Sequence, residues 1–311
     1  MNGMEQIALT KQSMKILVTG ACGQLGQDVV KEVLERGYTV IGSGTAKTVD
    51  CSVGMQYVQM DITDAAAVEQ IITRVGPDTV IHCAAWTAVD AAEEKINENV
   101  VRAVNVQGTE NIARACKKAD CKMICISTDY VFDGQGDEPW KPDCEEFHPL
   151  NVYGQTKLEG EQAVKRLLDK YFIVRIAWVF GVNGNNFVKT MLKLAETHDE
   201  LKVVADQIGT PTYTRDLAGL LADMAETDKY GCYHVTNEGG YISWYEFACE
   251  IFRQAGYRTK VIPVTTEEYG LSKAKRPLNS RLDKSKLAEN GFCLLPDWQD
   301  ALARFLRETA S

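Results

Sequence analysis

Residues 15–26 read KILVTGACGQLG, and this stretch decides the fold. Its first five residues form an apolar run typical of a buried strand. Glycines follow at positions 20, 23 and 26, and residues 27–36 then carry apolar side chains at helical spacing until Gly37. Strand, glycine-rich turn and helix in this order predict a dinucleotide-binding unit, in which the N–H groups that begin the helix bind phosphates. The spacing differs from the common Gly-x-Gly-x-x-Gly, so a purely structural turn is the alternative.

The chain after this unit alternates strands and helices. We expect further strands at residues 38–41, 57–60, 78–83, 122–126 and 172–177. Helical spacing is found at residues 64–75, over most of 90–118, and at 151–170. This alternation predicts an α/β fold with a Rossmann-like, doubly wound parallel sheet.

The pattern changes beyond residue 181. Helices are expected at residues 185–196, 217–226, 243–255 and 296–308, and short strands at 202–205 and 232–235. We therefore expect an NAD(P)-binding Rossmann domain at 15–180 and a smaller C-terminal α/β domain at 181–311 that mainly binds substrate. A segment near 206–236 is expected to return to the main sheet, and residues 1–14 to form a flexible N-terminal extension.

Composition excludes several classes of protein. The 311 residues carry a net charge of -9, which disfavours binding to nucleic acid. No apolar run reaches the ~20 residues that cross a bilayer, and no signal peptide is visible. Ten scattered cysteines without a Cys-x-x-Cys pair, and four histidines without ligand spacing, argue against a zinc site. We expect free thiols, a cytoplasmic location, and structural roles for His82 and His234.

The residues after the second and third strands bear on cofactor choice. An acidic residue after the second strand would bind the ribose 2′-hydroxyl of NAD, and none is present. Ser43, Thr45 and Lys47 could instead hold a 2′-phosphate, which favours NADPH over NADH. Asp61 follows the third strand, where it could cap the next helix or contact the adenine.

Tyr153 and Lys157 are the candidate catalytic pair. They stand four residues apart in YGQTK, residues 153–157, and so share one face of the predicted helix. A phenol titrates near pH ~10, and an adjacent ammonium should lower that value, so that the pair can exchange protons near neutral pH. An isolated Tyr-x-x-x-Lys also occurs on solvated helices. Thr128 ends the fifth strand, where it could hydrogen-bond a bound carbonyl or Tyr153, or cap the following turn.

Other segments are candidates for the rim of the site. Small residues at Ala84 and Ala85 would let a cofactor lie close to the backbone. The polar loop at residues 135–150 could cover the site. Arg276 lies in a basic loop that is either solvated or a clamp for a substrate pyrophosphate. The aromatic residues Trp244, Phe247 and Phe252 are expected to belong to a core.

Several of these segments together resemble the extended short-chain dehydrogenase/reductase family, and most closely its branch that reduces dTDP-4-dehydro-L-rhamnose. The resemblance covers almost the whole chain from residue 15. It is carried by the segments GACGQLG (20–26), CAAWTAVDAAE (83–93), STDYVFDG (127–134), YGQTKLEGE (153–161), RIAWVFG (175–181) and DQIGTPT (206–212). It implies NADPH or NADH as cofactor, a dTDP-sugar as substrate, no partner nucleic acid or membrane, and a possible homodimer.

The resemblance also implies roles for individual residues. The cofactor pyrophosphate would lie on Gly20, Gly23, Gln24, Leu25 and Gly26. The adenine would lie between Asp61 and Ile62, and the inner side of the cleft would be lined by Ala85, Trp86 and Thr87. The catalytic group would be Thr128, Tyr153 and Lys157, and the sugar nucleotide would contact Asp129 and Trp178. Trp86 replaces a histidine of some members, and the acidic cluster of magnesium-binding members is not visible.

Two other functions remain open at this stage. A nucleotide-sugar epimerase or dehydratase would use the same fold with a tightly held NAD, although dehydratases usually carry Thr-Asp-Glu where this chain has Thr128-Asp129-Tyr130. A non-catalytic regulatory subunit, similar to that of methionine adenosyltransferase, is the second alternative.

Overall fold

A seven-stranded parallel sheet forms the centre of the molecule, in a computed structural model that describes residues 13–49 and 54–310. Its strands are β1 (Lys15–Thr19), β2 (Thr39–Gly44), β3 (Gln56–Gln59), β4 (Thr79–His82), β5 (Lys122–Thr128), β6 (Tyr171–Ile176) and β11 (Gly231–Val235). They lie in the order β11-β6-β5-β4-β1-β2-β3. The predicted doubly wound parallel sheet is therefore confirmed. The expected extension at residues 1–14 lies outside the described residues, apart from Ser13 and Met14.

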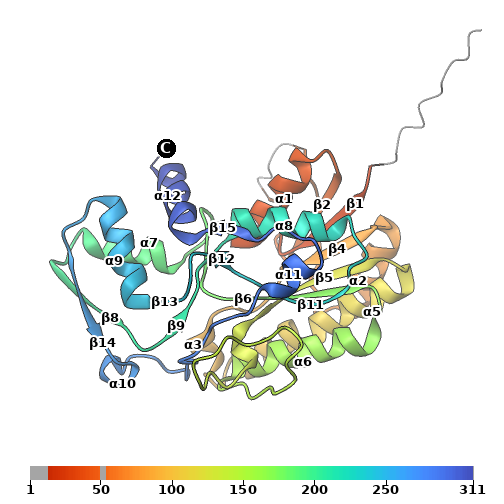
Figure 1. Ribbon diagram of the computed structural model, residues 1–311. Coiled ribbons are helices and arrows are strands. Elements are labelled where there is room, and N and C mark those ends of the chain that lie inside the picture. Colours follow the sequence, from red (N-terminus) through yellow and green to blue (C-terminus); the bar gives the residue numbers. More distant parts are fainter. Residues whose placement is uncertain (1–12, 50–53, 311) are drawn as a thin grey trace, which may run out of the picture.

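Helices cover both faces of this sheet (Figure 1). One face carries α1 (Gln24–Glu35) and α8 (Thr214–Ala225), and the other carries α2 (Ala65–Val75), α5 (Thr109–Ala119) and α6 (Val152–Leu167). Strand β1 shows why both faces are apolar: Ile16 and Val18 pack under α1 and α8, while Leu17 packs on the opposite side. Successive side chains alternate across a strand, so a continuous apolar run is buried on both sides.

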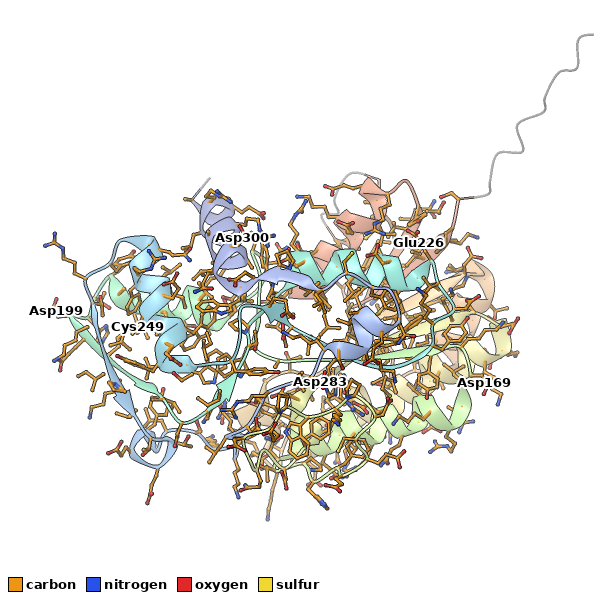
Figure 2. The ribbon with its side chains drawn as sticks, in the orientation of Figure 1. Asp169, Asp199, Glu226, Cys249, Asp283 and Asp300 are labelled. Atoms are coloured by element: carbon orange, nitrogen blue, oxygen red, sulfur yellow. The ribbon has the colours of Figure 1, made fainter. Side chains whose placement is uncertain are left out.

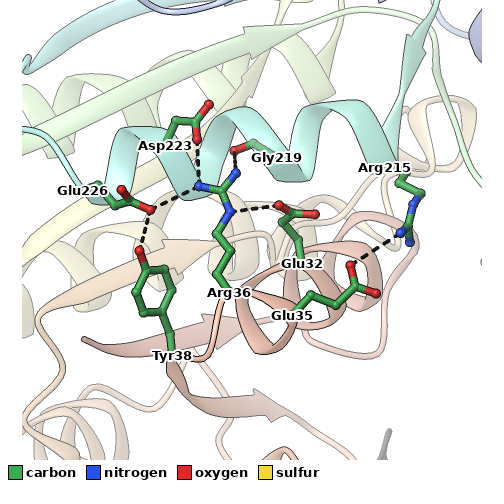
Figure 3. Close-up of polar contacts among 8 residues, drawn as sticks. All are labelled: Glu32, Glu35, Arg36, Tyr38, Arg215, Gly219, Asp223 and Glu226. Atoms are coloured by element: carbon green, nitrogen blue, oxygen red, sulfur yellow. Dashed lines mark hydrogen bonds and ion pairs between the residues drawn. The ribbon is translucent and has the colours of Figure 1, made fainter. Parts of the chain in front are cut away.

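Arg36, just after α1, ties α1 to α8 (Figure 3). Its Nε donates to Glu32 at 2.9 Å, its Nη1 to Asp223 at 2.7 Å, and its Nη2 to the Gly219 carbonyl at 3.0 Å. Each surface ion pair contributes little alone, but a guanidinium shared by several acceptors fixes relative position well. A helix from the second half of the chain thus completes one face of the main sheet.

The remaining elements form a smaller α/β part with its own core. It comprises α7 (Phe187–Ala195), α9 (Trp244–Ala255), α10 (Thr266–Tyr269) and α12 (Trp298–Thr309), with β8 (Glu200–Val204) paired to β14 (Lys260–Val264). Buried aromatic side chains fill this core, among them Phe180, Phe247, Trp298 and Phe305. In Figure 2, Asp199 marks this end of the molecule and Asp169 the opposite end.

Short strand pairs link the two parts. They are β7 (Val179–Phe180) with β10 (Thr212–Tyr213), β9 (Ile208–Gly209) with β13 (Ile242–Ser243), and β12 (Asn237–Glu238) with β15 (Leu295–Asp297). The short helix α11 (Ser285–Glu289) lies against β11 (Figure 1). Because β11 pairs with β6 along its whole length, a strand encoded after residue 206 does join the main sheet.

Two local expectations were wrong. The second strand extends to Gly44, because it pairs with β1 and β3 over that length, and Ser43 is consequently buried inside the sheet. Asp64, and not Asp61, caps α2 by accepting from two backbone N–H groups. The region expected to be mostly helical, residues 90–118, is mostly helical, but it is divided into α3 (Val89–Ala92), α4 (Glu98–Arg102), a π-helical turn η1 (Ala103–Gly108) and α5.

Candidate active site

A cleft of about 440 Å³ opens at the carboxyl ends of the central strands, between the main sheet and the smaller part. Most of the residues predicted for the site contribute to its wall. They are Gly20, Gly23, Gln24, Leu25, Gly26, Ala85, Thr87, Thr128, Asp129, Tyr153, Lys157 and Trp178. Segments separated by more than a hundred residues in the sequence therefore converge on one cavity.

The glycine loop has the geometry of a phosphate cradle. Gly20 has φ +66°, and a Cβ there would lie 2.8 Å from the Ala84 backbone. A Cβ on Gly26 would lie 2.1 Å from the Gly20 carbonyl oxygen, so only glycine lets the helix start so close to the strand. No side chain caps α1 at Gly23, which leaves its first N–H groups for an anion. A dinucleotide pyrophosphate fits this loop.

The start of α6 places Tyr153 and Lys157 in the cleft. The Asn151 side chain caps this helix by accepting from the Gly154 N–H at 2.8 Å. Gly154 lets the helix approach the turn after β5, since a Cβ there would lie 2.2 Å from the Tyr130 carbonyl oxygen. The Lys157 side chain is buried, and its Nζ donates to the Ile126 carbonyl at 2.7 Å.

The pKa of Tyr153 is raised in the structure, whereas a lowered pKa was expected. Burial raises the pKa of Tyr153 to about 12, a hydrogen bond with Thr128 acts in the opposite direction, and the charge of Asp129 raises it again. The predicted lowering by Lys157 is wrong for this structure, where the Lys157 ammonium is bound to a backbone carbonyl of β5. At neutral pH the phenol is therefore protonated and ready to donate.

Thr128 combines the roles that were predicted as alternatives. Its Oγ1 accepts from the Tyr130 N–H at 3.2 Å, which caps the turn after β5, and donates to Asp129 Oδ1 at 3.0 Å. It also interacts with the Tyr153 hydroxyl. One hydroxyl thus fixes both the turn and the phenol.

Asp129 is a buried carboxyl group whose second oxygen has no partner. Burial raises the pKa of Asp129 to about 6, against the opposing hydrogen bonds from Ser280 and Thr128. Its Oδ2 is buried and accepts no hydrogen bond from any residue within 13–49 and 54–310, unlike most buried polar atoms. A ligand hydroxyl in the cleft would satisfy it.

Asn105 is a structural residue of the site that the sequence did not single out. It is buried in the π-helical turn, accepts from the Trp86 N–H at 2.8 Å, and donates to Thr156 Oγ1 at 3.1 Å. Gly160 permits this contact, since a Cβ there would lie 2.7 Å from the Asn105 carbonyl oxygen. π-Helical turns often occur at functional sites, but they have no sequence signature that would have revealed this one.

Several predicted cofactor contacts lie outside the cleft wall. Asp61 is exposed and accepts from the N–H and hydroxyl of Thr63. Ile62 is buried beside Gly108. The Ala84 N–H donates to Thr19, and the Trp86 indole donates to the Ala88 carbonyl at 3.1 Å. Their roles towards adenine or nicotinamide remain predictions.

Arg276 does not line the cleft either. Its guanidinium pairs with Asp90 at 2.6 Å, and it lines an adjoining cavity of about 310 Å³ that shares Trp244 with the cleft. This ion pair lowers the pKa of Asp90. Arg276, the candidate for binding a substrate pyrophosphate, is thus paired with the Asp90 carboxylate at the edge of the site.

The expectation for Trp244 was incomplete. Phe247 and Phe252 are buried in the core of the smaller part, as predicted. Trp244 packs against that core but also lines the cleft, where its ring stacks on Trp178 at 3.8 Å. Helical spacing alone could not separate these roles, because Trp244 begins α9 and faces the opening.

The two buried histidines have structural roles. Burial lowers the pKa of His82 to about 3, and its ring contacts the hydroxyls of Thr19 and Thr109. The buried ring of His234 bonds the Trp140 carbonyl oxygen at 3.0 Å, and its pKa is also lowered by burial. Within residues 13–49 and 54–310, no group of three His, Cys, Asp or Glu side chains could hold a metal ion. Every helix in those ranges is too short or too polar to span a bilayer.

Comparisons with known proteins agree with this geometry. The family described as RmlD substrate binding domain matches residues 14–311. A dTDP-4-dehydrorhamnose reductase of Aggregatibacter actinomycetemcomitans is 41% identical over 303 residues, covering 93% of this chain and 97% of the relative. The spore coat polysaccharide biosynthesis protein SpsK of Bacillus subtilis is 39% identical over 298 residues, or 96% of this chain and 98% of SpsK.

A solved structure shows the same architecture. The crystal structure of dTDP-4-dehydrorhamnose reductase from Bacillus anthracis, in complex with NADP, superimposes with a TM-score of 0.86 at 40% identity. The match covers 96% of this chain and 100% of that chain.

Proposed function

Because the chain belongs to the RmlD substrate binding domain family, we propose that its cleft reduces the C4 keto group of dTDP-4-dehydro-L-rhamnose with NADPH. The product is dTDP-L-rhamnose, a precursor of cell-surface polysaccharide. The observation that carries the proposal is the meeting of the glycine loop with Thr128, Tyr153 and Lys157 in one cleft. The NADP complex of the B. anthracis relative supports NADPH as the preferred cofactor.

The reaction adds a hydride to carbon and a proton to oxygen. When bound, NADPH supplies the hydride that reaches C4 of the sugar. Tyr153 donates its hydroxyl proton to the oxygen on which negative charge develops, and its raised pKa keeps that proton in place beforehand. Thr128 holds the phenol in position. An ammonium has three donors, so Lys157 can keep its bond to Ile126 and also hydrogen-bond the nicotinamide ribose.

The substrate is proposed to bind on the other side of the cleft. Asp129 Oδ2 is an unsatisfied acceptor for a sugar hydroxyl, and Trp178 is an aromatic surface beside it. Arg276 is within the adjoining cavity, where it would exchange Asp90 for the substrate pyrophosphate. In this arrangement residues 15–180 mainly bind the cofactor and 181–311 mainly the sugar nucleotide. A cytoplasmic location and a homodimer complete the proposal.

The test is the loss of reduced nicotinamide absorbance after addition of dTDP-4-dehydro-L-rhamnose, generated in place by the upstream enzymes. We expect rapid, sugar-dependent loss that is faster with NADPH than with NADH, and dTDP-L-rhamnose as product. Full occupancy by NAD on purification, with turnover that needs no added cofactor, would instead identify an epimerase or dehydratase. Bound NADPH without turnover, together with co-purification of a methionine adenosyltransferase, would identify a regulatory subunit.

A further inference from the structure

Trp178 has an unusual backbone for a tryptophan. It follows β6 with φ +51°, in the left-handed region that side chains with a Cβ rarely adopt. Such a conformation costs free energy and persists only where the surroundings enforce it. The Thr212 N–H donates to the Trp178 carbonyl at 3.1 Å, which holds the backbone, but the indole itself projects into the cleft and needs other support.

Trp244 supplies that support on one face of the indole. The two rings lie 3.8 Å apart with an angle of 16° between their planes, and Phe187 packs on Trp244 with ring centroids 4.6 Å apart. A reciprocal capping box fixes the position of Trp244 as the first residue of α9: the Glu246 N–H donates to Ser243 Oγ at 3.1 Å and the Ser243 N–H to Glu246 Oε2 at 2.7 Å.

Gly209 leaves room for the edge of the indole because it has no side chain. A Cβ on Gly209 would lie 2.9 Å from Cε2 of Trp178, closer than real side chains approach, and 3.1 Å from both Cζ2 of Trp178 and Cβ of Ser280. Strand β9 pairs with β13, so that Gly209 stands opposite Ile242, two residues before Trp244. The β9–β13 pair therefore positions Gly209 and Trp244 together. These two residues of the smaller part lie around the Trp178 indole, which follows β6 of the main sheet.

We propose that Trp244 and Gly209 are positioning residues that hold the Trp178 indole as a rigid wall for the substrate. This inference rests on the proposed function, in which Trp178 contacts the sugar nucleotide. A ring fixed before binding loses no rotamer freedom when the substrate arrives, so the effect appears in substrate affinity. The hydride and proton transfers use other side chains and are not altered.

The kinetic test compares substitutions of Trp244 and Gly209. We expect Trp244→Ala to raise KM for the sugar nucleotide about 10-fold, with kcat and KM for NADPH changed less than about 2-fold. Trp244→Phe, which restores an aromatic face, should recover most of the affinity. Gly209→Ala should reproduce the rise in KM while keeping both indoles. Gly219→Ala in α8 is the matched control, because a Cβ there has no neighbour closer than 3.9 Å.

A double substitution separates positioning from direct contact. If Trp244 acts through Trp178, the pair Trp178→Ala and Trp244→Ala should bind substrate no worse than Trp178→Ala alone. Fully additive losses of affinity would overturn the inference. So would an unchanged KM in Trp244→Ala, or a loss confined to kcat.

A spectroscopic test needs no substrate. Two stacked indoles couple in circular dichroism, and we expect Trp178→Phe and Trp244→Phe to abolish the same coupled signal. Its persistence in either variant would show that the rings are not stacked in solution, and would overturn the inference while leaving the reductase assignment intact. A wild-type protein that does not reduce the sugar overturns the proposed function, and with it the substrate role of this wall.

Discussion

Tyr153 lies partly buried in the site as a neutral phenol, and the acid role proposed for it depends on that state. We expect Tyr153→Phe to lower kcat by ~10²–10⁴-fold, because the developing alkoxide loses its proton donor. Binding of NADPH, followed by fluorescence, should change little. Since the pKa of Tyr153 is about 12, this group should cause no loss of reduction rate between pH 7 and pH 9.

Tyr233, a buried tyrosine outside the cleft, provides the control for Tyr153→Phe. The Tyr233 hydroxyl donates to the Lys229 carbonyl at 2.7 Å, away from the cleft. Tyr233→Phe should leave kcat unchanged. Full activity in Tyr153→Phe would refute the assignment of the acid.

Asp129 gives the site a pH dependence near pH 6. Its pKa of about 6 means that the carboxylate, the form proposed to accept a sugar hydroxyl, is lost as the pH falls through that value. We expect kcat/KM for the sugar to decrease at pH values below 6. The Asp129→Asn variant should not show this decrease. Asp137→Asn, an exposed position in the nearby 135–150 loop, should retain it.

The Asp129 carboxyl group should lower the free energy of unfolding at neutral pH. Its folded-state pKa lies above the ordinary pKa of an aspartate in an unfolded chain, about 3.9, so the folded state binds the proton more tightly than the unfolded state. Stability contributed by the neutral form is present below pH ~3.9 and is lost as the pH rises to about 6. Asp129→Asn should therefore raise Tm at pH 7 and not at pH 4. A lower Tm at pH 7 would contradict this linkage.

At the scale of elements, a buried ion pair joins α6 to β6 behind the catalytic residues. Glu161, one helical turn after Lys157, accepts from Arg175 Nη2 at 2.7 Å and from Ser127 Oγ at 2.5 Å, and both charged side chains are at most 1% exposed. Arg175 also donates to the Pro142 carbonyl at 3.1 Å in the 135–150 loop. One guanidinium thus connects α6, the main sheet and the 135–150 loop.

We expect Glu161→Gln to lower the free energy of unfolding by ~3–5 kcal/mol, because it leaves a buried guanidinium without its counter-charge. Urea denaturation measures this change, and limited proteolysis should cleave the 135–150 loop faster. Glu159→Gln on the same helix removes a partly exposed pair with Arg102 and should cost less than about 1 kcal/mol. Equal decreases in the free energy of unfolding of the two variants would show that burial of the Glu161–Arg175 pair does not determine its contribution to stability.

The junction of β1 and α1 is the second element under tight constraint. A Cβ at Gly26 would overlap the Gly20 carbonyl oxygen at 2.1 Å, so Gly26→Ala must push the loop out of shape. We expect NADPH binding, measured by titration calorimetry, to weaken about 10-fold or more. Undiminished affinity would mean that the pyrophosphate does not lie on this loop.

At the scale of the whole molecule, Arg276 and Asp90 join the smaller part to the main sheet across the site. We expect Arg276→Ala to raise KM for the sugar nucleotide about 10–100-fold, as for a lost charged hydrogen bond, and to leave KM for NADPH unchanged. Asp90→Asn releases the guanidinium and should not raise KM. An equal rise in both variants would assign the pair a purely structural role. Lys273→Ala, beside it on the surface, is the control.

The sequence predicted the main sheet well because its signals are local. Apolar runs, the glycine loop and the caps of α6 and α9 each lie within a few residues of the element that they determine. Ser43 was wrongly expected to follow the second strand. The length of β2 depends on its pairing with β1 and β3, which no local sequence pattern indicates. Tertiary pairing of this kind overrides local propensity.

The site was predicted in part for a similar reason. The proposed catalytic residues lie in recognisable motifs, and the fold brings them together at the carboxyl ends of the strands. The raised pKa of Tyr153 and the stack of Trp244 on Trp178 depend on burial and on contacts between distant segments. Such effects follow from three-dimensional packing and are not encoded in motif spacing.

The late return of β11 to the edge of β6 has a consequence for synthesis on the ribosome. Strand β6 leaves the exit tunnel roughly 55 residues before β11, a delay of about 3–11 s at typical elongation rates. During that interval the edge of β6 is unpaired in the growing chain, and the apolar face of α1 is not yet covered by α8. A nascent chain arrested near residue 180 should therefore need a chaperone to avoid aggregation.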